Sequence, residues 1–172
     1  MTFATFIDRL GGFILFPVFS VYVISQFGVG ITEVGFLFSI FSLGHIIGGM
    51  IGGALADKYG RRIITLIGLI ASGIGSIFMG LVNELYLFYL IAAILGTIGN
   101  FGGPARQAMV ADLLPSETQP EGFGILRVAV NLSATIGPIL SSIIAVFSFM
   151  LLFILDAVSS LITAVIVLIV IP

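Results

Sequence analysis

The sequence Gly-Gly-Ala-Leu-Ala-Asp-Lys-Tyr-Gly-Arg-Arg, residues 52–62, decides the fold because it is a short charged break between two long apolar runs. The runs cover about 33–56 and 63–82, and each is long enough for a membrane-spanning helix, which needs about 20 mostly apolar residues. The break carries three basic residues, Lys58, Arg61 and Arg62. The pattern therefore predicts two spanning helices that are joined by a tight, charged loop.

The rest of the chain repeats this pattern. Four further apolar runs lie at about 4–25, 85–105, 122–146 and 149–171, with a tight hairpin expected near 147–148. The runs are too long for strands and lack the alternation of a membrane barrel, and helices satisfy their own backbone groups in hydrocarbon. The sequence predicts an all-α integral membrane protein, a six-helix bundle that forms one domain over 1–172.

The composition excludes most other classes of protein. Charged residues make up 8% of the chain and hydrophobic residues 59%, with a mean hydropathy of +1.31, whereas soluble domains carry about 25% charged residues. There is no basic stretch for nucleic acid, no cysteine, one histidine and no phosphate-binding loop, so we expect no nucleic-acid partner, metal, cofactor, ATP-driven step or enzymatic activity. The expected surroundings are the lipid bilayer.

Lysine and arginine predict the orientation. The loop at 57–62 holds three of the basic residues, and Arg9, Arg106 and Arg127 lie near helix ends that fall on the same side. The positive-inside rule then places the N-terminus, this loop, the loop at 106–122 and the C-terminus in the cytoplasm. The run that follows Asp8-Arg9 is interpreted as a retained first helix, because no small-residue cleavage site follows it.

Small residues recur every fourth position in three of the predicted helices. Such stripes form grooves that let helix backbones approach closely in lipid, so we expect helix–helix contacts there. The stripes are Gly44, Gly48 and Gly52; Gly68, Ser72, Ser76 and Gly80; and Ser133, Gly137 and Ser141.

The charged break resembles the signature loop of the major facilitator superfamily of membrane transporters, G-x-L-A-D-R/K-x-G-R-R/K. The matching residues are Gly53, Leu55, Ala56, Asp57, Lys58, Gly60, Arg61 and Arg62. The resemblance implies that Asp57 latches the two halves of a transporter and helps to gate it. The alternative is a loop that only sets the topology and forms a local salt bridge. Gly60 suits the tight turn.

Two later segments resemble the drug–proton antiporter branch of that superfamily. Residues 102–115 contain an Arg…Ala-Asp-Leu…Pro stretch, and residues 133–142 resemble the motif G-x-x-x-G-P-x-x-G-G around Gly137-Pro138, with serine in place of three glycines. The branch implies proton-coupled efflux of small amphipathic or drug-like compounds across the plasma membrane by alternating access. The alternatives are an exporter or permease for a specific metabolite or siderophore, and a half-size membrane partner that does not transport.

The resemblance covers only half of the family's architecture. Its transporters have twelve helices in two six-helix halves, and this sequence resembles the N-terminal half. Because the substrate path lies between the halves, we expect a second six-helix half as a partner. The chain is then a fragment, a truncated product or a half-size protein that dimerises.

Ionisable residues in a spanning helix are costly and are functional hypotheses by default. His45 is interpreted either as a proton carrier, with an ordinary pKa of about 6.5, or as a neutral residue of the cavity wall, where polar Asn100 and Asn131 are also candidates. Asp156 is interpreted as a protonated or hydrogen-bonded structural residue, because the sixth helix tends to be peripheral in the family; the alternative is a proton-carrying or cavity residue. For Arg127 we expect Asp8 as partner, with Asp112 second.

The remaining charges suggest a network on the cytoplasmic side. Its expected members are Asp8, Arg9, Asp57, Arg106, Asp112 and Arg127. The network would stabilise one alternating-access state, so neutralising Arg127 should alter transport more than membrane insertion. The family also implies that the first and fourth helices line the substrate path, with parts of the second and fifth. The candidate lining residues are Phe13, Phe16, Ser20, Tyr22, Thr97, Asn100 and Phe101; the alternative is that the aromatic residues only pack or face lipid.

Overall fold

The structure is a computed structural model that describes residues 2–170, and it is helical almost throughout. Its helices are α1 (Thr2–Phe27), α2 (Ile31–Tyr59), α3 (Arg61–Leu81), α4 (Leu85–Gly99), α5 (Gly102–Leu113), α6 (Gln119–Ala145) and α7 (Phe149–Val170). Within the described residues, six stretches are long and apolar enough to cross a membrane, since α4 and α5 form one stretch, Leu85–Asp112. The predicted all-α bundle with six spans is confirmed, and only residue 171 of the predicted sixth helix lies outside the described residues.

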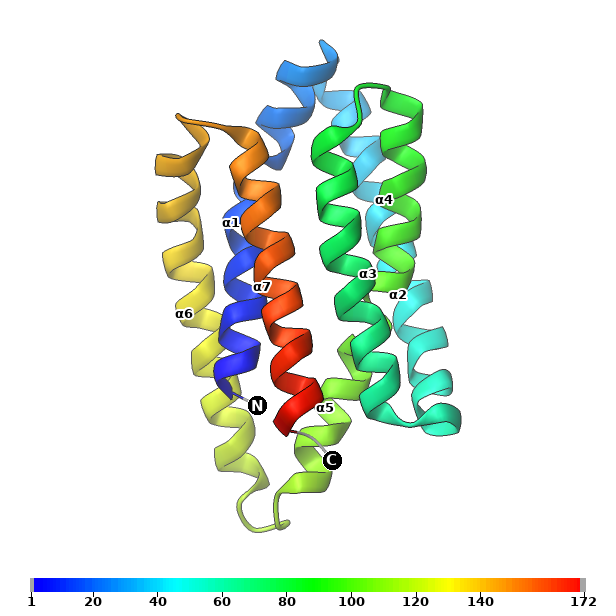
Figure 1. Ribbon diagram of the computed structural model, residues 1–172, viewed down its shortest axis with the longest axis vertical. Helices are drawn as coiled ribbons and strands as arrows, with labels where there is room; N and C mark the ends of the chain where they lie inside the picture. The colour runs from blue at the N-terminus through cyan, green and yellow to red at the C-terminus, as the bar shows by residue number, and fades with distance from the viewer. Residues whose placement is uncertain (1, 171–172) are drawn as a thin grey trace.

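The helices form two groups that meet along α3 and α7. Helix α1 packs against α6 and α7, while α2 packs against α4, and α3 contacts α7 as well as α4 and α5. Figure 1 shows α6, α1 and α7 on one side of the molecule and α3, α4 and α2 on the other. Helix α1 begins and α7 ends at the same end of the bundle, where the α2–α3 junction and the α5–α6 loop also lie.

The junction between α2 and α3 is shorter than the loop predicted at 57–62. Helix α2 continues to Tyr59 and α3 starts at Arg61, so Gly60 alone separates them. Gly60 has a φ of +98°, which glycine adopts without steric cost, and its N–H donates to the Ala56 carbonyl at 2.9 Å. Asp57 is therefore in the last turn of α2 rather than in a loop.

The fourth span differs most from the prediction. The sequence favoured a helix over 85–105 and a loop over 106–122, but the chain turns at 100–101 and continues as α5 to Leu113, and α6 begins at Gln119. Pro104 is the third residue of α5, a position in the first turn where the missing N–H has no helical partner to lose. The Gly103 N–H donates to the Asn100 carbonyl at 3.1 Å across the turn. Arg106 thus lies on a helix.

The stripes of small residues form the expected close contacts. A Cβ on Gly44 would lie 3.0 Å from the Ala93 carbonyl oxygen of α4, and one on Gly48 would collide with the Thr97 carbonyl. A Cβ on Gly137 would lie 2.6 Å from the Cβ of Phe13, so α6 and α1 touch where Pro138 follows in the α6 helix. The stripes of α2 and α6 bring these helices against α4 and α1 as predicted.

Candidate functional site

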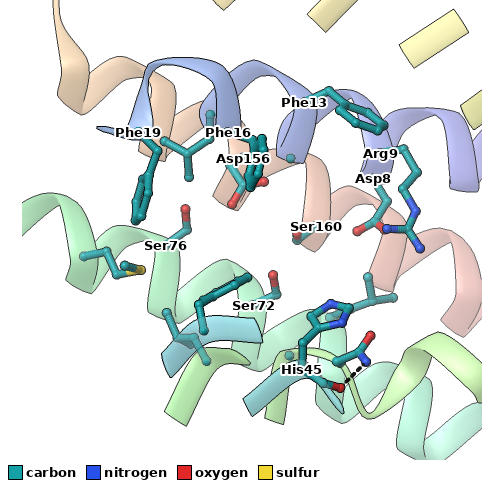
Figure 2. Close-up of a pocket in the computed structure, with 18 of the residues that line it drawn as sticks. Asp8, Arg9, Phe13, Phe16, Phe19, His45, Ser72, Ser76, Asp156 and Ser160 are labelled. Carbon is teal, nitrogen blue, oxygen red and sulfur yellow. Dashed lines mark hydrogen bonds between the residues drawn. The ribbon is translucent and has the colours of Figure 1, made fainter. Parts of the chain in front are cut away.

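A cavity of about 390 Å³ lies between the two groups of helices. Its size is in the range of pockets for small organic molecules. Figure 2 shows aromatic and polar side chains facing it from several helices. Its aromatic and ionisable wall residues are Phe13, Phe16, Phe19, Phe38, Phe41, Asp8, Arg9, His45, Arg106 and Asp156, and its smaller polar ones are Ser72, Ser76, Asn100 and Ser160. The wall can therefore hold an apolar ring system and also interact with charge.

An ion pair forms part of the cavity wall. Arg106 Nη1 of α5 donates to Asp8 Oδ2 of α1 at 2.5 Å, and the two side chains are 17% and 12% exposed. Because both charges are largely withdrawn from water, each depends on the other for compensation. The pair fixes the start of α1 against α5, and Arg9 lies beside it on the same wall.

The partners expected for Arg127 are wrong. Asp8 binds Arg106, and Asp112 forms an ion pair with Arg61, which also donates to the Ala108 carbonyl at 3.0 Å. The reason is the α5 helix, which continues past the expected end of the fourth span and carries Arg106 alongside Asp8. Arg127 instead lines a second groove of about 510 Å³ together with Arg9 and Arg106.

The six-residue network is therefore divided into separate parts. Two of its carboxylates are paired as described, and Asp57 is exposed and forms no ion pair with any residue that the structure describes. Asn131 is exposed on α6 and lies outside the walls of both the cavity and the groove. The structure brings together the Asp8–Arg106 pair, Arg9 and His45 but not Asp57.

The signature loop anchors α3 through its basic side chains. Arg61 contacts α5, as described, and Arg62 Nη2 donates to the Leu168 carbonyl of α7 at 2.6 Å. Lys58 lies over the ring of Tyr59, with Nζ 5.2 Å from its centroid. A Cβ on Gly53 would meet no atom within 4 Å. Gly53 and Asp57, one turn apart on α2, thus leave an uncovered face at this end of the bundle.

His45 and Asn100 face each other across the α2–α4 contact. Asn100 Nδ2 donates to the His45 backbone carbonyl at 2.7 Å, and the His45 ring lies 6.1 Å from the ring of Phe41. The Asn100 side chain thereby holds the turn between α4 and α5 against α2. The His45 imidazole remains on the cavity wall, and Figure 2 shows it opposite Ser160 and Asp8.

The candidate lining residues divide into two sets. Phe13, Phe16 and Asn100 line the cavity, whereas Ser20, Tyr22, Thr97 and Phe101 do not. Tyr22 is buried in the aromatic core and its hydroxyl donates to the Met79 carbonyl at 3.4 Å. Thr97 Oγ1 donates to the Ala93 carbonyl of its own helix at 2.8 Å. Phe101 packs beside the buried cluster around Ala56.

Sequence reasoning missed the share of α3 in the cavity wall, and from α7 it named only Asp156 as a possible cavity residue. Ser72 and Ser76 were interpreted only as part of a packing stripe, and Ser160 was not considered, yet all three line the cavity. Asp156 also lines it, because one face of α7 packs against α1 and α3, while the opposite face stays exposed. The signal that could have indicated this is the pair of serines in the α3 stripe, because their hydroxyl groups suit the polar part of a cavity wall.

Comparisons with known proteins point to one family. The model of the Major Facilitator Superfamily matches residues 1–172. Multidrug resistance protein MdtH of Salmonella paratyphi C is 29% identical over 142 residues, 83% of this chain and 35% of that protein. The same protein of Shigella flexneri is 28% identical with the same coverage.

A further relative carries a different name. The "Na(+), Li(+), K(+)/H(+) antiporter" of Planococcus maritimus is 26% identical over 135 residues, 76% of this chain and 31% of that protein. The chain spans about a third of the length of the curated relatives it matches. With the family model matching from end to end and the six spans in place, the chain belongs to the Major Facilitator Superfamily.

Proposed function

We propose that this chain is one half of a secondary active transporter that exports small amphipathic compounds across the plasma membrane in exchange for protons. The observation that carries the proposal is the central cavity, which is lined by five phenylalanine side chains together with charged and hydroxyl-bearing side chains. Aromatic faces accept flat apolar ligands without strict geometry, and the few polar groups add orientation. The relatives named multidrug resistance protein MdtH support drug-like compounds as the substrates.

Transport into or out of vesicles that contain the full-length protein tests this proposal. Efflux of ethidium should require a proton gradient and stop when a protonophore collapses it. Phe16→Ala should weaken efflux because it removes a ring from the cavity wall, whereas Phe3→Ala should not, since Phe3 is an exposed residue of the same helix outside the cavity. Gradient-independent efflux, or equal effects of the two variants, would contradict the proposal.

The orientation and the partner belong to the same proposal. The basic residues favour a cytoplasmic location for the end of the bundle that holds the start of α1, the α2–α3 junction and the end of α7. The uncovered face with Gly53 and Asp57 lies there, and we assign it to contact with a second six-helix half. Asp57→Asn should then reduce efflux while the thermal stability of the protein stays unchanged. Full efflux in that variant would show that Asp57 does not latch the two halves.

A second candidate function is the exchange of monovalent metal cations for protons. The Planococcus relative favours it by name, and the cavity offers carboxylate and hydroxyl oxygens, the ligands that hard cations prefer. The two candidates separate in the same vesicles. Proton flux that is started by sodium or lithium, in the absence of ethidium, would favour cation exchange over efflux.

A further inference from the structure

Asp156 is a cavity carboxylate that forms no ion pair with any residue the structure describes. It lies about 10 Å along α7 from Phe149, at 1.5 Å per residue, well inside a spanning helix. A Cβ on Gly11 of α1 would lie 3.1 Å from its Cα, so α1 covers this part of α7 against lipid. An ionisable residue at this position needs a function or a partner.

Two serine side chains flank this carboxyl in the cavity (Figure 2). Ser76 of α3 is 4% exposed, lines the cavity, and its Oγ has no hydrogen-bond partner among the described residues. Figure 2 shows Asp156 between Ser76 and Ser160. Since a hydroxyl both donates and accepts, Ser76 can donate to the ionised carboxylate and accept from the protonated acid. Ser159 is engaged elsewhere, because its hydroxyl donates to the Asp156 backbone carbonyl at 2.8 Å.

The other charged or ionisable side chains of the cavity come from helices other than α7. From α1 come Asp8, which is committed to Arg106 of α5, and Arg9; from α2 comes His45. Helices α3 and α4 contribute no charged side chain to this wall, and Arg127 of α6 opens into the separate groove. Figure 2 shows Asp8 and Arg9 beyond Ser160 as seen from Asp156. Asp156 is thus the carboxylate whose charge can change without breaking an ion pair.

We propose that Asp156 is a proton-binding site of the cavity and that Ser76 is the hydroxyl that positions its proton. The carboxylate takes one proton from water on one side of the membrane and becomes a neutral acid. It returns the same proton to water on the other side when the bundle changes its conformation, and the negative charge of the cavity is restored. No bond other than the O–H bond forms or breaks.

This inference rests on the proposed proton-coupled function, and two measurements keep them apart. In vesicles with the protein as it is encoded, Asp156→Asn should lose uphill ethidium efflux driven by a proton gradient. It should retain ethidium exchange between the two sides when no gradient is present, since the aromatic wall remains. Asp156→Glu should restore part of the gradient-driven efflux, and Glu117→Gln, which alters an exposed loop acid, should leave both activities unchanged.

Infrared difference spectroscopy between low and high pH tests the site without transport. Wild-type protein should show the carbonyl stretch of a protonated carboxylic acid in an apolar setting, and Asp156→Asn should lack this band. Ser76→Ala should keep the band but move the pH of its half-change, which a merely structural serine would not do. Because Asp156→Glu retains a carboxyl group, it should show a shifted band even if the asparagine variant folds poorly.

The outcomes separate the two claims. Gradient-driven efflux that persists in Asp156→Asn, or a band that survives in that variant, would overturn the proton site and leave the proposed function intact. Wild-type protein that shows the band but no gradient-driven efflux would retain the site and reject proton-coupled export. A Ser76→Ala variant with an unchanged pH of half-change would remove the positioning role of Ser76.

Discussion

Arg106, and not the expected Arg127, is the ion-pair partner of Asp8. Both side chains are largely withdrawn from solvent and they lie on helices far apart in the chain. Because a charge in such a place is stable only with its counter-charge, the pair holds α1 against α5 at the cavity wall.

We expect Arg106→Gln to destabilise the folded protein by about 3 kcal/mol or more, because it leaves Asp8 buried without its cation. Thermal unfolding of the purified protein in detergent measures the change. The double variant Asp8→Asn with Arg106→Gln should recover most of the stability, since neither charge is then left uncompensated. A double variant as unstable as the single one would show that the pair is not the cause.

At the scale of helices, the glycine stripe of α2 determines how closely α2 and α4 approach. Gly48 lies against the Thr97 carbonyl with no room for a Cβ, whereas a Cβ on Gly35 of the same helix would meet no atom within 4 Å. Packing and close backbone approach hold helices together in lipid, where there is little hydrophobic drive between them. The two glycines thus offer a matched pair for testing the contact.

Gly48→Ala should therefore destabilise the bundle by about 1–3 kcal/mol through overpacking. Gly35→Ala should leave the stability unchanged or raise it by up to about 1 kcal/mol, because alanine is the better helix former. Thermal unfolding of both variants decides between these effects. If the two substitutions have the same effect, close approach at Gly48 does not hold α2 to α4.

The spans were predictable because length and apolar character alone determine them. The helix α5 was not, because Arg106 and Gln107 resemble a loop unless a neighbouring helix provides Asp8 as a partner. Asp156 presented a different difficulty: α7 is apolar on nearly every side, so its pattern does not show which face is covered. Only the packing of α1 and α3 on α7 places that carboxyl at the cavity.

At the scale of the molecule, one end of the bundle collects the basic residues. The α2–α3 junction and the α5–α6 loop lie at that end, and the α6–α7 hairpin lies at the other. The chain has no cysteine, so single cysteines can report the orientation in cells without a background. Glu117 in the α5–α6 loop and Phe147 in the hairpin are exposed positions.

An impermeant maleimide should label Phe147→Cys in intact cells and Glu117→Cys only after the membrane is permeabilised. This result follows from a cytoplasmic location of the basic end. Labelling in the opposite order would reverse the orientation, and labelling of both positions in intact cells would contradict a single topology.

The central claim is that the cavity between the two groups of helices holds the transported compound. The most direct test is whether the compound protects a cysteine at position 72 from alkylation. Ser72→Cys replaces a hydroxyl of the cavity wall with a thiol of similar size. Ethidium should slow the alkylation of this thiol in the protein as it is encoded, and it should not change the alkylation of Glu117→Cys. If ethidium leaves the rate at position 72 unchanged while the protein still exports it, the cavity is not the binding site.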